Sequence, residues 1–229
     1  MPTIMAPDLQ GLLKLLQLAS PALPVGAYSY SEGLETLVHQ GLIEPDAIVQ
    51  WLDQELTCGL IRAEGVVVQR VHKAAQAEDW DVIAHDNQWL SALRDSEETR
   101  QQSWAMGRAL VRLMLDLEPE VANQLEVMAS PCNFAVAFAR LAAHWQIPAQ
   151  TTGLAYLHSW AANLITAAVK LVPLGQTQGQ QMLLQLYPTL EAAVRDGATA
   201  CLEEVALSNW GATLATMQHE AMYSRLFRS

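Results

Sequence analysis

The residue types that most often perform catalysis or bind metals are present in this sequence but scattered along it. The six histidines are His39, His72, His85, His144, His158 and His219. None lies three or four residues from another histidine or from a cysteine, which is the spacing that places two metal ligands on one helical face. A histidine without a second ligand nearby in sequence usually has a structural role, so the sequence predicts no metal site within one protomer. Single histidines pooled by two protomers across a symmetry axis remain an alternative.

The motifs of common enzyme classes are absent as well. The sequence has no GxxxxGK[ST] segment to cradle a phosphate, no HExxH, no ExxH pair on facing helices and no GxSxG. The three cysteines, Cys58, Cys132 and Cys201, lie far apart and form no CxxC motif. We therefore expect reduced, buried thiols, no catalytic residue, no metal ligand and no cofactor held by this chain.

The amino-acid composition disfavours some classes of binding partner and favours others. The 229 residues include 24 acidic and 13 basic side chains, a net charge of −11, which argues against nucleic acid and favours a partner with a basic patch. Only 16% of the residues are charged and 51% are hydrophobic, so we expect another chain to cover some apolar surface. The charge run at Glu97 and Glu98 indicates a solvated helix face. The start of the chain lacks the pattern of a signal peptide, and polar residues interrupt the apolar tract 154–172, which predicts a cytoplasmic protein without a membrane span.

Helical periodicity dominates the chain. A first helix is expected after an Asp8 N-cap and before Ser20, and further helices at 32–39, 45–77, 79–93, 96–117, 120–128, 133–145, 150–172, 176–197 (kinked or broken at Pro188) and 213–223. Gly59 and Gly65 interrupt the longest of these, and a close helix crossing would explain them. The sequence predicts one all-α domain over 1–229, a bundle of about eight to ten helices, with flexible ends at about 1–7 and 224–229.

One long segment carries no acidic residue. Residues 127–190 contain neither Asp nor Glu, and Arg140 and Lys170 are their only fixed charges. Two interpretations stay open. The segment is either an interior helix pair or part of a seam between two copies of the chain. The second interpretation predicts a homodimer with Ala161 and Ala168 near the seam.

Two further segments carry apolar residues where polar ones are usual. Pro24, Gly26 and Tyr28 belong to a loop, 21–30, that is fixed by prolines and carries aromatic side chains. The C-terminal tail, 224–229, places Leu226 and Phe227 between two arginines. A loop needs such residues if it folds back on the core or meets a partner, and a chain end with an apolar pair is typical of an anchor. Both alternatives remain open for each segment.

Three motifs in this sequence resemble those of the urease accessory protein UreF family. Residues 15–35 (LLQLASPALPVGAYSYSEGLE) resemble its N-terminal signature, residues 170–180 (KLVPLGQTQGQ) its second signature, and residues 224–229 (SRLFRS) its C-terminal end. The order of the motifs and the chain length also agree with the family. Ala27 is a small departure, because many relatives have a second glycine there.

The resemblance implies a fold and a function. UreF proteins are all-α, dimerise, and have no catalytic activity; they bridge UreD (also called UreH) and the GTPase UreG in a complex that delivers nickel to apo-urease. Nickel and GTP would then belong to partner proteins. The resemblance also implies partner-binding roles, with UreG expected at the loop and the 170–180 segment and UreD/UreH at the tail. The implied residues are Pro24, Gly26, Tyr28, Lys170, Gln176, Gln180, Arg225, Leu226, Phe227 and Arg228.

Two other functions compete with this one. The first is an all-α enzyme or carrier that binds haem or a small apolar ligand between helices, with His158 as a haem ligand. Absorbance with and without added haem would test it. The second is a transcription or signalling adaptor, which the net charge of −11 and the lack of a basic cluster disfavour.

Overall fold

The computed structural model describes residues 7–42, 44–119, 131–208 and 210–229, and this part of the chain is built from helices without strands. In chain order they are α1 (Leu9–Leu18), η1 (Ala27–Ser29), α2 (Leu34–His39), α3 (Pro45–Cys58), α4 (Leu60–Gln76), α5 (Trp80–Leu93), α6 (Glu97–Leu117), α8 (Phe134–His144), α9 (Ala149–Leu171), α10 (Gln176–Gln185), α11 (Tyr187–Gly197), η3 (Leu202–Glu204) and α12 (Trp210–Glu220). The predicted all-α fold is confirmed. The helix expected at 120–128 lies outside the described residues.

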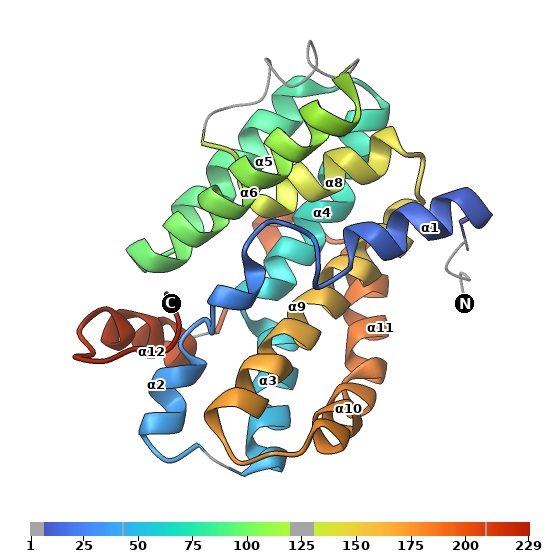
Figure 1. The fold of residues 1–229 in the computed structure, drawn as a ribbon. Helices are drawn as coiled ribbons and strands as arrows, with labels where there is room; N and C mark the ends of the chain where they lie inside the picture. The colour runs from blue at the N-terminus through green and yellow to red at the C-terminus, as the bar shows by residue number, and fades with distance from the viewer. Residues whose placement is uncertain (1–6, 43, 120–130, 209) are drawn as a thin grey trace.

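Helix α8 lies in the upper part of the bundle in Figure 1, enclosed by its neighbours. Every residue from Ala135 to Ala143 is buried, and the helix packs against α4, α6 and α9. Five of those nine residues are alanines, whose small side chains let neighbouring helices approach closely from several sides. Gly107 of α6 shows how close this approach is, since a Cβ atom there would lie 2.1 Å from the carbonyl oxygen of Cys132.

The acid-free segment is explained by this core. Ala161 and Ala168 of α9 are completely buried inside their own chain. The interior helix pair is therefore the correct interpretation for these two residues, and the seam expected at them is wrong. At the buried positions of this segment, a carboxylate would lose its hydration without gaining a partner, which explains its absence there.

The single helix predicted at 45–77 is in fact two. Gly59 adopts an extended conformation between α3 and α4. The Glu55 side chain folds back to this break, so a Cβ at Gly59 would lie 2.1 Å from its carboxylate oxygen. Gly65 does fulfil its predicted role, because a Cβ there would lie 3.1 Å from the side chain of Leu157 on α9. The break expected at Pro188 is confirmed, with Pro188 in the first turn of α11.

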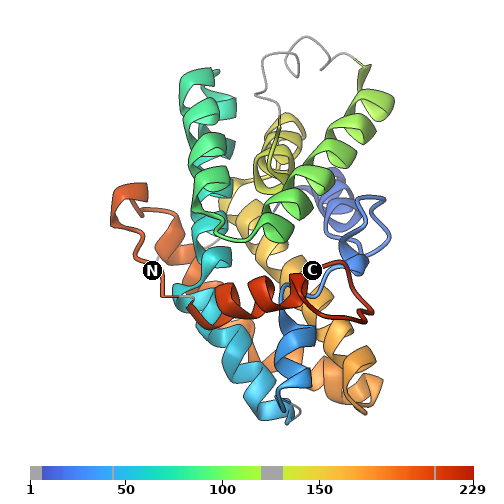
Figure 2. The same cartoon turned by 90° about the vertical axis from the view of Figure 1, so that its left-hand side faces the viewer.

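Helix α12 packs across α2 and α6 and brings the end of the chain back toward its beginning (Figure 2). No described helix combines the length and apolar character that crossing a bilayer requires. The cysteines have free thiols, but the expectation that all are buried is wrong, since Cys201 is exposed and Cys58 is partly exposed.

Candidate functional site

Segments that contain the three motifs, far apart in sequence, meet on one face of the molecule, the second of them through α9, whose end begins the second motif. The Asn163 side-chain amide of α9 donates to the carbonyl oxygen of Ala27 at 3.0 Å. The backbone N–H of Arg228 donates to the carbonyl oxygen of Ser29 at 2.8 Å. We call the surface formed by residues 19–33, 163–180 and 224–229 the loop–tail face.

The loop divides its side chains between the core and the solvent. Gly26 has φ of +81°, a left-handed conformation that favours glycine, and it turns the chain into η1. Val25 and Tyr30 are buried in the core, as expected if the loop folds back on its own domain. Pro24 is exposed, and Tyr28 is 66% exposed. Packing therefore explains part of the loop, while Pro24 and Tyr28 are left free to meet a partner.

Helices α9 and α10 supply the second part of the loop–tail face. Lys170, Gln176 and Gln180 are all exposed. The two glutamines and Tyr28 line the mouth of the same cavity, so the structure brings together segments whose proximity could not be derived from the sequence. The Lys170 ammonium lies 5.7 Å from the centre of the Phe227 ring, which joins this part to the tail.

The tail packs on the domain, which differs from the expected flexible end. The Glu35 carboxylate accepts the backbone N–H groups of Leu226 at 2.7 Å and of Phe227 at 3.0 Å. The carbonyl oxygen of Ser229 accepts the backbone N–H of Ser31 at 2.6 Å. Phe227 is only 6% exposed, whereas Leu226 is 64% exposed. In this structure, therefore, Phe227 anchors the tail to its own chain, and Leu226 faces the solvent.

A buried histidine connects the tail to two helices. His219 of α12 is buried, and its two ring nitrogens lie 3.1 Å from a Glu35 oxygen and 2.9 Å from a Glu98 oxygen. Glu98 also pairs with Arg225. The prediction of a solvated face was therefore wrong for Glu98. Burial alone would raise the pKa of Glu35, but the N–H groups of Leu226 and Phe227, with His219, lower it instead.

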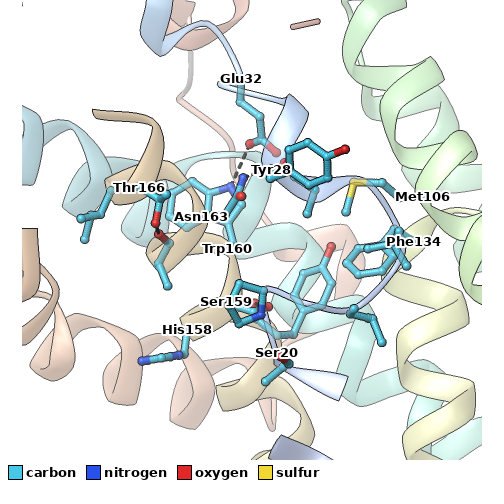
Figure 3. A pocket seen from close by; sticks show the side chains of 18 of the residues that line it. Ser20, Tyr28, Glu32, Met106, Phe134, His158, Ser159, Trp160, Asn163 and Thr166 are labelled. Atoms are coloured by element: carbon cyan, nitrogen blue, oxygen red, sulfur yellow. Dashed lines mark hydrogen bonds between the residues drawn. The ribbon is translucent and has the colours of Figure 1, made fainter. Parts of the chain in front are cut away.

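A cavity of about 340 Å³ opens on the loop–tail face (Figure 3). Its inner end contains charged side chains that are linked to one another, since Glu64 accepts hydrogen bonds from Arg94 and from the Tyr156 hydroxyl. Glu32, which follows the loop, also lines the cavity, and burial together with the nearby Glu64 raises its pKa. This polar end of a mainly apolar cavity had no signal in the sequence, because its members come from different elements.

His158 is the residue that the sequence suggested as a haem ligand. His158 lines the edge of the cavity, and its ring centre lies 6.1 Å from that of Tyr187 on α11. Figure 3 shows its ring directed away from Phe134 and Met106 on the opposite wall. Within the described part of the chain, no three His, Cys, Asp or Glu side chains are grouped so that they could hold a metal ion.

Comparisons with known proteins agree on one family. The UreF family model matches residues 43–187. A protein named urease accessory protein UreF from Nostoc sp. is 51% identical over 218 residues, covering 95% of each chain. Proteins of the same name from Trichormus variabilis and Microcystis aeruginosa are 50% and 49% identical, covering 95% and 97% of this chain and 95% and 99% of their own.

Proposed function

The chain belongs to the UreF family of urease accessory proteins, and we propose that it is a non-enzymatic scaffold in urease maturation that bridges UreD/UreH and the GTPase UreG. In this proposal nickel and GTP are bound by the partner proteins, and the scaffold helps to deliver nickel to apo-urease. It works in the cytoplasm, as a homodimer, and needs no cofactor of its own.

The observation that carries the proposal is the convergence of the three motif segments on the loop–tail face. Side chains with no role in packing gather there, including Tyr28 and Leu226. Exposed tyrosine and arginine side chains on a supported surface are typical of interface hot spots. We assign Pro24, Tyr28 and the 170–180 segment to UreG, and Leu226 with its flanking arginines to UreD/UreH.

Replacement of Tyr28 tests the assignment of UreG. Because Tyr28 is 66% exposed, Tyr28→Ala removes little packing, and the melting temperature should stay close to that of the parent. Loss of an interface tyrosine typically costs about 2 kcal/mol, so we expect roughly thirtyfold weaker recruitment of UreG in a pull-down titration. Binding of UreD/UreH should persist.

Tyr187→Ala is the matched control, because Tyr187 is also an exposed tyrosine but lies on α11. It should recruit UreG as the parent does. Undiminished recruitment by Tyr28→Ala would move the UreG site elsewhere. Unfolding of Tyr28→Ala would show that the loop serves the core instead.

A further inference from the structure

We infer that the cavity beneath the loop is a binding site for a small, neutral, largely apolar molecule that carries one hydrogen-bond acceptor. Its volume of about 340 Å³ falls within the range of pockets that hold small ligands, about 300–1,000 Å³. The inference does not depend on the partners proposed above.

The walls of the cavity are mainly apolar and come from four parts of the fold. Val25 belongs to the loop, Met106 to α6, Phe134 to α8 and Ile165 to α9. Figure 3 shows Met106 and Phe134 on one wall and Trp160 on another. Side chains of this kind gain from contact with an apolar body.

One buried hydrogen-bond donor of a residue that lines the cavity has no partner. Arg94 is only 4% exposed and lines the cavity. Its Nη2 atom donates to Glu64, and its Nε atom donates to the carbonyl oxygen of Thr99 at 3.2 Å. Its Nη1 atom is buried and has no hydrogen-bond partner. Buried donors in folded proteins are nearly always paired, so this atom indicates an occupant that supplies an acceptor.

The nearby carboxylates already accept hydrogen bonds from the protein. One Glu64 oxygen accepts from Arg94 and the other from the Tyr156 hydroxyl. The two oxygens of Glu32 accept from the Gln102 amide at 2.7 Å and from the Trp160 indole at 2.8 Å. Neither carboxylate therefore needs a hydrogen bond from a ligand.

The charges around the cavity favour a neutral ligand. The Arg94 guanidinium is paired with Glu64, so the two charges offset each other. Burial and the neighbouring Glu64 raise the pKa of Glu32, so a further negative charge in the cavity is unfavourable. A ligand carboxylate would face both glutamates, and a ligand ammonium would lie beside the guanidinium and leave Nη1 unpaired. A carbonyl or ether oxygen meets Nη1 without adding a charge.

Three probes with the same phenyl ring test the inference on the isolated chain. Acetophenone carries a neutral carbonyl, benzoate a carboxylate and benzylamine an ammonium group at neutral pH. We expect acetophenone to bind at least tenfold more tightly than the other two in calorimetric titrations. Saturation-transfer NMR should show its ring protons in contact with the protein. Tightest binding of benzylamine or benzoate, or no binding of acetophenone, would overturn the inference.

The second measurement uses a variant in which a larger side chain fills the cavity. Ala162 lines the cavity and is partly buried, so Ala162→Phe should occupy the space and weaken acetophenone binding at least tenfold. Ala149→Phe is the matched control, because Ala149 belongs to the same helix and the same exposure class but lies outside the cavity lining. It should bind the probe as the parent does. Equal losses in the two variants, or no loss in Ala162→Phe, would refute the site. Because partners are absent from this assay, its result is separate from the test of UreG recruitment.

Discussion

Glu55 is the carboxyl group with the clearest consequence for stability near neutral pH. Burial, and then repulsion from Glu32, raise its pKa from 4.5 to about 7, although it accepts the backbone N–H of Leu60. Glutamate in the unfolded chain ionises near 4.5, so the folded state holds the proton over a wider range. The stabilising contribution is fully present below pH 4.5 and is lost as the pH rises to about 7.

Replacement of Glu55 by Gln tests this sign. The amide keeps an acceptor for Leu60 but never ionises. At pH 8, Glu55→Gln should raise the free energy of unfolding relative to the parent by up to about 3 kcal/mol, and at pH 4.5 the two proteins should be nearly equal. Urea denaturation at the two pH values measures the difference. The exposed Glu191→Gln should show no such pH dependence. An equal effect of Glu55→Gln at both pH values would contradict the prediction.

Single residues differ in how far their roles could be predicted from the sequence. The apolar and aromatic residues of the proline-fixed loop predicted either core packing or partner binding. Pro24 and Tyr28 are both exposed. Glu35, Glu98 and His219 escaped prediction because they come from α2, α6 and α12. Their hydrogen bonds depend on how these helices pack, and no local spacing encodes that arrangement.

The C-terminal tail packs on its own chain through Phe227, and we propose that the exposed Leu226 binds a partner. Phe227→Ala should destabilise the domain by about 3 kcal/mol, because the ring is buried. Leu226→Ala should leave the free energy of unfolding nearly unchanged, because the side chain is 64% exposed, but should weaken the pull-down of UreD/UreH. Thermal melts and a pull-down titration on both variants provide the measurements. Normal UreD/UreH binding by Leu226→Ala would contradict the proposed anchor.

Helix positions follow periodicity well, whereas helix breaks do not. The predicted segments at 79–93, 133–145 and 150–172 agree with α5, α8 and α9 to within one residue at each end. The predicted helix through Gly59 failed because the break there depends on the Glu55 carboxylate and on packing. An apolar stripe records which face is buried but does not record whether the backbone is continuous.

The bundle as a whole explains its charge pattern. Acidic residues are absent from 127–190, and the described part of that segment forms α8, α9, α10 and the start of α11. Large apolar side chains are exposed on α1 (Leu9, Leu13 and Leu16), on α12 (Trp210 and Leu214) and also within this segment, at Leu184 and Tyr187. In the proposed homodimer, the seam uses exposed side chains such as these rather than the buried Ala161 and Ala168.

Acidic substitutions on α9 distinguish a core from a seam. Ala161→Asp places an unpaired carboxylate in the interior at a cost of several kcal/mol, comparable to the whole stability of a domain. We expect circular dichroism to show an unfolded or aggregated chain. Ala149→Asp, in the first turn of the same helix, should stay folded because an acid there suits the helix dipole. Light scattering should report a dimer for both the parent and Ala149→Asp. If Ala161→Asp is folded and monomeric, the dimer seam includes Ala161 after all. If the parent is monomeric at micromolar concentration, the proposed homodimer is wrong.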